Sequence, residues 1–253
     1  MKLLSYNIRF GGRGRETRLA DTIRAIDPDL VIFQEATDPQ VIQGLAKATT
    51  LPFWAAQPAH SIAYISRIEI AHHAWHYPVG SKHSFLEIVP VGTEARIFGL
   101  HLSAIFSKWS EQRRVREIRA LLKGIEKYQE GMHVLVGDFN TLAPGELLDV
   151  RRMPGWIQAL IWLSGREIKR EAIQVMLAAN YVDGFRTLYP ETKGYTFPTW
   201  DPHLRLDYVF LPVGFQKRLT ACQVITEPKP VAQASDHFPL LAEIDLDAPT
   251  STR

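Results

Sequence analysis

The feature that most limits the fold is a run of five short strand-like segments between residues 53 and 103, separated by Pro, Gly and Ser-Lys turns. The turns leave no room for a helix between consecutive strands, and strands joined by short turns pair antiparallel. The segments are FWAAQP, HSIAYIS, IAHHAWHYPV, SFLEIVPV and ARIFGLHLS. This part of the chain is therefore expected to form antiparallel β-sheet.

Strand-like and helix-like segments alternate before this run. Apolar strands begin at Lys2 and Asp29, each is followed by a helical pattern, and Asp27-Pro28 ends the first helix. A third amphipathic helix begins at Ser110 and ends near Gly131. Basic residues form a run on it, interspersed with Glu111 and Glu117, which favours a solvated helix face over a DNA-binding surface. The run is Arg113, Arg114, Arg116 and Arg119.

The second half is irregular from Thr141 to about Asn180, apart from a predicted helix over 166–180 and the apolar run WIQALIWL at 156–163. Three strands close the chain, RLDYVFLP, LTACQVI and PLLAEIDL. Many antiparallel strands with few helices indicate an α/β chain of two sheets packed face to face, with helices on the outer faces. No linker or low-complexity segment divides it, so one domain is expected over 1–247, with a tail at 248–253.

Composition excludes some classes of protein. Cys222 is the only cysteine, so neither an intramolecular disulfide nor a Cys-based zinc cluster can form. The net charge of +2 is too small to indicate or exclude nucleic acid as a partner. No signal-peptide pattern follows Met1, and no apolar run is long enough to cross a membrane. A monomer in the reducing cytoplasm is the expectation.

Polar residues of one chemical kind stand at the ends of several apolar strands. An unpaired buried carboxylate costs several kcal/mol, so this recurrence calls for a common cause. Carboxylates, carboxamides and waters are the ligands of hard cations such as Mg²⁺ and Mn²⁺, whereas zinc favours His and Cys. The pattern therefore predicts a magnesium-type site. Its residues are Asn7, Glu35, His101, Asp138, Asn140, Asp207, Asp236 and His237.

The motifs that carry these residues resemble those of the endonuclease/exonuclease/phosphatase superfamily, which includes DNase I-like nucleases, inositol phosphatases and sphingomyelinases. SYNIRF, IFQEA, LHL, VGDFN, RLDYVF and SDH occur in the family's order and at roughly its spacing, from Asn7 to His237. Each motif alone is weak, but the ordered set is specific. The resemblance implies a four-layer α/β/β/α sandwich of two mixed sheets, with the site at one edge.

The resemblance also implies roles for the metal and water ligands. Glu35 matches the principal metal carboxylate, Asn7 the amide beside it, and Asp236 a further metal ligand in the closing motif. Asp138 and Asn140 match the pair that handles the attacking water and the phosphoryl oxygens. Mg²⁺ or Mn²⁺ is the expected cofactor.

The histidines are assigned in the same way. His237 matches the residue that contacts the scissile phosphate, and Asp207 the carboxylate that orients it. A neutral His237 is expected as base and a protonated His101 as phosphate donor. Arg9 and His101 resemble DNase I-like members rather than abasic-site enzymes, and both are predicted to bind substrate together with Asn140. The family's carboxylate partner for His101 is missing, since residues 66–67 are Ser-Arg.

Two motifs stay outside this set. HHAWH, with His72, His73 and His76, is interpreted as an exposed strand rather than a second metal site, because no carboxylate lies beside it in the sequence. The run at 156–163 is interpreted as a core-packing helix. The alternative is an exposed apolar segment that contacts lipid or a hydrophobic part of the substrate.

The sequence therefore predicts a divalent-metal-dependent phosphodiester hydrolase. A nuclease acting on DNA or RNA is favoured by Arg9, His101 and the mildly basic charge. The alternative is a phosphatase or a sphingomyelinase-like phospholipid phosphodiesterase, for which a lipid head group is the partner. A binding module that has lost catalysis is disfavoured, because all the motif residues are intact.

Overall fold

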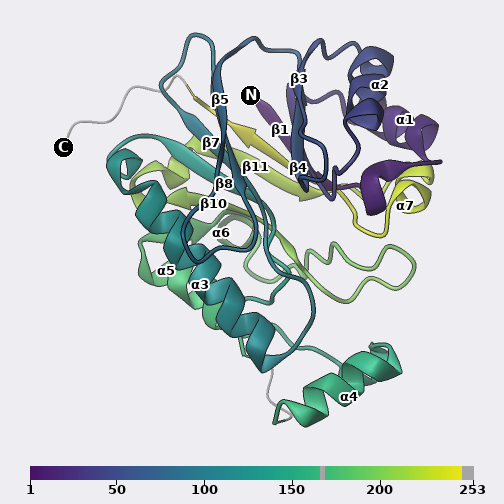
Figure 1. Ribbon diagram of the computed structural model, residues 1–253, viewed down its shortest axis with the longest axis vertical. Coiled ribbons are helices and arrows are strands. Elements are labelled where there is room, and N and C mark those ends of the chain that lie inside the picture. Colours follow the sequence, from purple (N-terminus) through teal and green to yellow (C-terminus); the bar gives the residue numbers. More distant parts are fainter. Residues whose placement is uncertain (166–168, 247–253) are drawn as a thin grey trace.

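Two six-stranded mixed sheets form the centre of the protein (Figure 1). The computed structural model describes residues 1–165 and 169–246, so the predicted tail lies outside the described residues. The first sheet has the order β11-β12-β1-β2-β4-β3 and the second β5-β6-β7-β8-β10-β9. The first contains β1 (Lys2–Asn7), β2 (Leu30–Gln34), β3 (Phe53–Ala55), β4 (Ile62–Ser66), β11 (Leu219–Val224) and β12 (Leu240–Ile244). The second contains β5 (Ile70–His76), β6 (Phe85–Pro90), β7 (Arg96–His101), β8 (His133–Asp138), β9 (Tyr181–Asp183) and β10 (Asp207–Pro212).

Helices cover the outer face of each sheet. The first sheet is covered by α1 (Glu16–Ile26), α2 (Pro39–Thr49) and α7 (Pro230–Ala234), and the second by α3 (Lys108–Gly124) and α5 (Glu171–Ala178). Two more helices are α4 (Gly155–Leu163) and α6 (Gly184–Leu188). Short 3-10 turns are η1 (Phe10–Gly12), η2 (Glu126–Tyr128), η3 (Val150–Arg152) and η4 (Val213–Arg218).

Alternation along the strands explains the layers. Successive side chains of a strand point to opposite faces. In β1, Leu3 joins the cluster between the two sheets, while Leu4 packs with Leu19 and Ile42 of the outer helices. Phe98 of β7 packs outward in the same way against α3 and α5. The predicted four-layer α/β/β/α sandwich is confirmed.

Each sheet contains one parallel pair joined through a helix, β1 and β2 through α1, and β7 and β8 through α3. Parallel strands end at the same edge of a sheet. In the register, His101 lies opposite Asp138, and Asp207 at the start of β10 also lies opposite Asp138. The topology therefore collects polar strand ends from distant parts of the chain at one edge.

The expected solvated face of α3 is wrong for three of its charged residues. Arg114, Glu111 and Glu117 are buried, each at most 2% exposed. The Arg114 guanidinium donates to Glu111 and to the carbonyls of Ser103 and Ile105. This side of α3 faces the loop that leaves β7, and the carbonyls of that loop satisfy the buried cation.

Glu117 holds the same loop. Its two oxygens accept hydrogen bonds from the amide (3.0 Å) and the hydroxyl (2.8 Å) of Ser103, two residues beyond His101. We expect Glu117→Gln to lower the free energy of unfolding by about 1–3 kcal/mol, because a buried acceptor is replaced by a donor that faces donors. Urea denaturation measures the change. Glu126→Gln, on the exposed turn after α3, is the matched control and should change stability by less than about 0.5 kcal/mol.

The HHAWH motif lies outside the predicted site and forms part of a strand. HHAWH lies on β5, the edge strand of the second sheet, where His72 and His73 are exposed. His76 instead pairs with Glu87 of the neighbouring strand, with Nε2 2.6 Å from a carboxylate oxygen. Among the described residues, these histidines are not part of a group suited to a metal ion. The strand is therefore confirmed, but its exposure only in part, because His76 is half-buried beside the Glu87 carboxylate.

The helix at 156–163 is confirmed as α4, but core packing is only partly confirmed. Ile161 alone of its residues is buried, whereas Trp156, Trp162 and Leu163 are 57%, 58% and 64% exposed. The helix predicted over 166–180 is shorter as α5, and 166–168 lie outside the described residues. No helix in the described ranges combines the length and apolar character needed to cross a membrane.

Candidate active site

Asp138, the last residue of β8, is the point at which the predicted site residues converge. Its Oδ2 accepts a hydrogen bond from Asn7 Nδ2 at 3.0 Å. The Nε2 atoms of His101 and His237 each lie 3.8 Å from the same oxygen. Asp138 is 1% exposed, so these contacts form in a nearly dry environment. Four chain segments thus meet at one carboxylate.

His237 is oriented by a second carboxylate. Its Nδ1 lies 2.9 Å from Asp207 Oδ2, which leaves Nε2 facing Asp138. The ring of Phe197 packs on the imidazole with centroids 4.8 Å apart. Asp207 Oδ1 is buried without a hydrogen-bond partner in the described part of the chain. The predicted Asp207–His237 pair is therefore present in the geometry expected of an oriented histidine.

Asn7 joins Asp138 to Glu35. The Asn7 amide also donates to Glu35 Oε1 at 3.2 Å, and Glu35 Oε2 accepts from the Phe10 backbone amide at 2.7 Å. Asp236 lies to the side, with a carboxylate oxygen 3.2 Å from Arg9 Nε. Of the predicted metal ligands, the structure thus brings Asn7 and Glu35 together, while Asp236 is held by the predicted substrate ligand Arg9.

Asn140 ties together the two loops that leave β7 and β8. Its backbone amide donates to Asp138 Oδ1 at 2.8 Å, and its side-chain amide donates to the Leu102 carbonyl at 3.0 Å. The Leu102 amide in turn donates to the Asp138 carbonyl. Asp138 and Asn140 therefore keep a fixed position relative to His101.

The backbone is strained at this edge. Arg9, Phe10, Glu35 and Asn140 all have positive φ, between 47° and 57°, although none is glycine. Non-glycine residues in this region cost about 1–2 kcal/mol each, and they cluster at functional sites where the surroundings enforce them. Four such residues at this edge indicate that the fold tolerates a loss of stability in order to position the site side chains.

Ser235 and His83 were not singled out by sequence reasoning. Ser235 Oγ donates to the Asn7 carbonyl at 2.6 Å, which fastens the SDH motif to the end of β1. The His83 ring lies 5.7 Å from that of His101. Ser235 is the first residue of the SDH motif, which is a signal for its role, whereas nothing in the sequence around His83 marks that residue.

The protonation states differ from those expected. Burial raises the pKa of the Asp138 carboxyl to about 7, against the lowering effect of His237. Burial lowers the pKa of His237, but the charges of Asp207 and Asp138 outweigh it and raise this pKa to about 10. These shifts favour a charged His237 over the expected neutral base, and they bring the pKa of the Asp138 carboxyl close to neutral pH.

His101 shows the opposite behaviour. Burial lowers its pKa to about 3, and the nearby His83 and His237 act in the same direction. Its Nδ1 has no hydrogen-bond partner among the described residues, which agrees with the missing carboxylate at Ser66-Arg67. Burial therefore favours a neutral His101 imidazole over the expected protonated phosphate donor.

Two sets of residues have the chemistry to hold a divalent cation. Asp138, Asp207 and His237 offer ligand atoms that all lie within 4.8 Å of one another. The second set is built on Glu35, which is only half-buried and so remains open to hydrated Mg²⁺. The Asn7 side chain lies between the two sets, because its amide donates to Glu35 Oε1 and to Asp138 Oδ2. The unpartnered Asp207 Oδ1 and the oxygen-rich donors fit a hard cation in this region.

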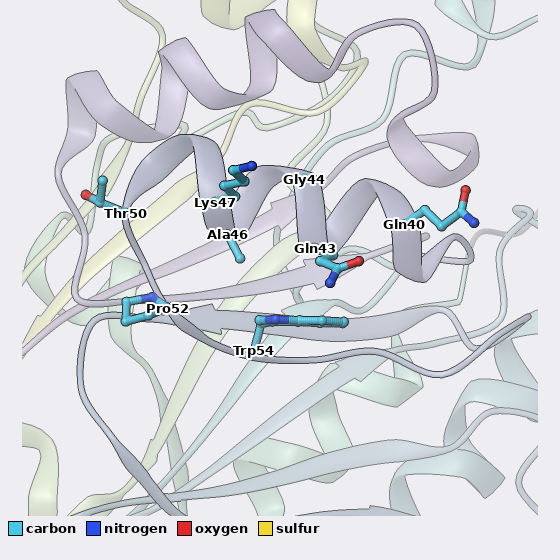
Figure 2. Close-up of a pocket in the computed structure, with 8 residues that line it drawn as sticks. All are labelled: Gln40, Gln43, Gly44, Ala46, Lys47, Thr50, Pro52 and Trp54. Carbon is cyan, nitrogen blue, oxygen red and sulfur yellow. The ribbon is translucent and has the colours of Figure 1, made fainter.

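A groove elsewhere on the surface has no share in this site. It lies between α2 and β3, has a volume of about 800 Å³, and is lined by the Trp54 ring below and by Gln43 and Lys47 of the helix (Figure 2). None of its lining residues belongs to the predicted set. The groove is therefore not part of the candidate active site.

Comparisons with known proteins agree with the fold and the motifs. A variant of the 3' phosphatase NExo from Neisseria, bound to product DNA hairpin, has TM-score 0.73 and 19% identity, covering 97% of this chain and 99% of that one. An AP endonuclease from Archaeoglobus fulgidus has TM-score 0.71 and 17% identity, covering 97% and 99%. A humanized D. rerio TDP2 has TM-score 0.66 and 18% identity, covering 96% and 97%. At these identities the similarity shows the fold alone.

Sequence comparison defines the family. No curated protein matches the chain significantly. The Endonuclease/Exonuclease/phosphatase family model, in contrast, matches residues 4–237, which include every predicted site residue. The chain therefore belongs to the Endonuclease/Exonuclease/phosphatase family.

Proposed function

We propose that the protein is a divalent-metal-dependent phosphodiester hydrolase that acts on nucleic acid. The observation that carries this proposal is the convergence of His101 Nε2 and His237 Nε2 at 3.8 Å from Asp138 Oδ2. Separations of 3.8 Å are too long for direct hydrogen bonds, so Asp138 Oδ2 and the two Nε2 atoms stay able to bond one further oxygen atom that lies beside them. A phosphoryl oxygen or a water is the natural occupant.

Asp138 is the proposed base. A carboxyl with a pKa near 7 is half ionised at neutral pH and accepts a proton more strongly than an ordinary aspartate. The backbone amide of Asn140 fixes the orientation of the carboxylate by donating a hydrogen bond to Oδ1. The carboxylate therefore points Oδ2 at the water it would deprotonate.

His237 is the proposed cationic donor to the phosphate. Asp207 holds its Nδ1 and stabilises the imidazolium, so Nε2–H is free to donate to a nonbridging oxygen. His101 donates from a neutral ring to the same group, and Arg9 at the rim contributes further positive charge. Together these residues counter the negative charge that increases as water attacks.

Glu35, with Asn7 and Asp236, is the proposed metal site, and Mg²⁺ or Mn²⁺ is the proposed ion. A bound ion supplies Lewis-acid stabilisation of the phosphoryl and leaving oxygens. The half-buried Glu35 carboxylate is held in place by the Asn7 side chain and the Phe10 amide. These contacts fix its position before any ion binds.

Exposed aromatic residues beside the site favour a nucleic-acid substrate. Phe10 is 77% exposed one residue after Arg9, whose guanidinium lies 5.4 Å from the Phe10 ring centroid. Trp200 is 69% exposed and contacts Phe197, which packs on His237. Aromatic side chains next to a positively charged site stack on bases. Two of the similar structures, the DNA-bound 3' phosphatase variant from Neisseria and the AP endonuclease from Archaeoglobus fulgidus, support the same choice.

The test is cleavage of supercoiled plasmid and of end-labelled single- and double-stranded oligonucleotides. We expect nicking or shortening with Mg²⁺ or Mn²⁺, no activity in EDTA, and recovery when the ion is restored. Metal-dependent hydrolysis of bis-p-nitrophenyl phosphate without cleavage of any nucleic acid would refute nucleic acid as the substrate but support phosphodiester hydrolysis. No hydrolysis of any phosphoester would refute both.

A phospholipid phosphodiesterase of the same fold is the second candidate, because α4 exposes two tryptophans and a leucine. Release of a phosphorylated head group from sphingomyelin or phosphatidylcholine vesicles, by protein that leaves plasmid DNA intact, would favour it.

The monomeric state and the cytoplasmic location stay predictions. Gel filtration of the full chain tests the first.

The proposed roles predict the pH dependence of kcat/KM on bis-p-nitrophenyl phosphate. Activity should rise about tenfold per pH unit below about pH 7, because Asp138 must lose its proton to act as base. It should then stay level to about pH 9, since His237, with a pKa of about 10, remains protonated. Initial rates between pH 5.5 and 9.5 at saturating metal give the profile. Activity that falls above pH 7 would show that His237 is not the cationic donor.

A further inference from the structure

The outward side of α4 is an apolar surface. At 100° per residue, Trp156, Ala159 and Leu163 fall on one side of the helix, Trp162 flanks them, and the buried Ile161 lies opposite. The nine residues of the helix include no charged side chain. Singly exposed hydrophobic residues are ordinary, but a continuous face of this kind marks an interaction site.

The inner side of α4 is anchored beside the candidate active site. Ile161 and Ile157 belong to a small cluster with Phe106, Leu142 and Leu206. Phe106 lies in the loop after His101, Leu142 follows Asn140 by two residues, and Leu206 precedes Asp207. Figure 1 shows α4 at the lower edge of the protein, apart from the other labelled helices. A surface docked on α4 would therefore adjoin the loops that carry the site.

The chain beside α4 is basic. Arg151 and Arg152 precede the helix, and Lys169 and Arg170 follow it. The Arg151 side chain is 90% exposed and contacts Asp149 at 3.1 Å. Exposed ion pairs of this kind contribute only about 0–1 kcal/mol, so Arg151 can exchange Asp149 for another anion at little cost. Arg152 instead pairs with Asp201, and Arg170 donates to the Glu146 carbonyl. Arg151 is therefore the cation of the preceding segment that can pair with an external anion.

We propose that α4 docks on the surface of an anionic lipid bilayer, with its tryptophans and Leu163 below the head groups and Arg151 at the lipid phosphates. Tryptophan and leucine on one face with arginine at the border is the pattern of helices that lie in a membrane interface. A second copy of the chain fits less well. A nine-residue helix is about 14 Å long and 10–12 Å wide, which offers far less than the roughly 800 Å² per partner of a stable interface.

Nucleic acid fits this face less well, because the nine residues of α4 include no charged side chain to pair with phosphates, although its tryptophans could stack on bases. The inference goes beyond the proposed hydrolysis and does not depend on it, since binding is measured without substrate. Peripheral attachment through α4 would hold the site loops at a lipid surface whatever the substrate is.

The experiment is cosedimentation of the full chain with vesicles of phosphatidylcholine alone or mixed with phosphatidylglycerol. We expect binding to the mixed vesicles, and roughly tenfold weaker partitioning for Trp156→Ser and for Leu163→Ser, because each removes a large apolar group from the interface. Arg151→Gln should weaken binding to the mixed vesicles about fivefold. Trp156→Phe should retain binding, and Val91→Ser, at an exposed turn 49% accessible between β6 and β7, is the control and should not change it.

Three results would overturn the proposal. The first is no cosedimentation with either vesicle. The second is binding that Trp156→Ser and Leu163→Ser leave unchanged, or that Val91→Ser lowers equally. The third is a concentration-dependent dimer in gel filtration that Trp156→Ser abolishes, which would assign the face to a second copy of the chain. Circular dichroism of each variant confirms that the fold is intact before binding is compared.

Discussion

Asp138→Asn should lower kcat/KM for phosphodiester hydrolysis by about a thousandfold, because the substitution removes the proposed base from the point where Asn7, His101 and His237 converge. Asparagine keeps the size of the side chain but accepts no proton at neutral pH. The remaining rate would come from the histidines and the metal. Initial rates on bis-p-nitrophenyl phosphate at saturating Mg²⁺ measure the loss.

The fold should survive this change, which separates catalysis from stability. Because burial raises the Asp138 pKa from 3.8 to about 7, the ionised carboxylate costs stability, and this cost increases as the pH rises from about 4 to 7. The asparagine side chain removes this cost, but its amide would face one of the two donors that Asp138 accepts from, Asn7 Nδ2 or the Asn140 amide, which costs about 1–3 kcal/mol. The two effects offset one another, so the variant should remain folded at pH 8, which urea denaturation checks. Asp21→Asn, at an exposed carboxylate on α1, is the control and should keep full activity. Near-normal rates for Asp138→Asn would contradict the assigned role.

Gly137→Ala should lower the free energy of unfolding by at least about 3 kcal/mol, because both the backbone and the space exclude a side chain there. Gly137 has φ of 148°, and a Cβ would lie 1.9 Å from the Leu100 carbonyl oxygen. That carbonyl belongs to β7, which runs beside β8 at this point. Relief of the clash requires the two strands to separate next to His101 and Asp138, so activity should fall with stability.

Gly92→Ala is the matched control for this prediction. Gly92 also has positive φ, 82°, but a Cβ there has no neighbour within 4 Å. Its replacement should cost only the backbone strain, about 1–2 kcal/mol. Urea denaturation monitored by tryptophan fluorescence compares the two. Equal losses would show that contact with Leu100 is not what requires glycine at position 137.

The layers of this fold could be predicted because most strands and helices have strong periodic patterns. Short turns between residues 53 and 103 predict antiparallel pairing, which is confirmed for β3 with β4, β5 with β6 and β6 with β7, whereas β4 and β5 lie in different sheets. The bounds of α1 and α2 match their helical patterns. The three-residue β9 and the five-residue α7 could not be predicted, since neither is long enough to show a period. Their positions follow from packing against neighbours.

The set of candidate site residues could be predicted from polar strand ends, but their environments could not. Arg114 has the pattern of a solvated arginine, yet its partners include backbone carbonyls of a loop that reaches α3 only in the folded chain. The protonation of Asp138 and His237 likewise depends on burial and on a neighbour about 100 positions away in the sequence. Such effects are tertiary, and no local pattern reports them.

Glu35, Asn7 and Asp236 come from distant parts of the chain and are proposed to bind one divalent ion. Anomalous diffraction from crystals soaked in Mn²⁺ measures this directly. We expect a manganese peak at the Glu35 carboxylate, next to the Asn7 side chain and on the side of Asp236, and its loss in Glu35→Gln. A peak that survives in Glu35→Gln, or manganese bound only at surface carboxylates remote from this edge, would contradict the claim.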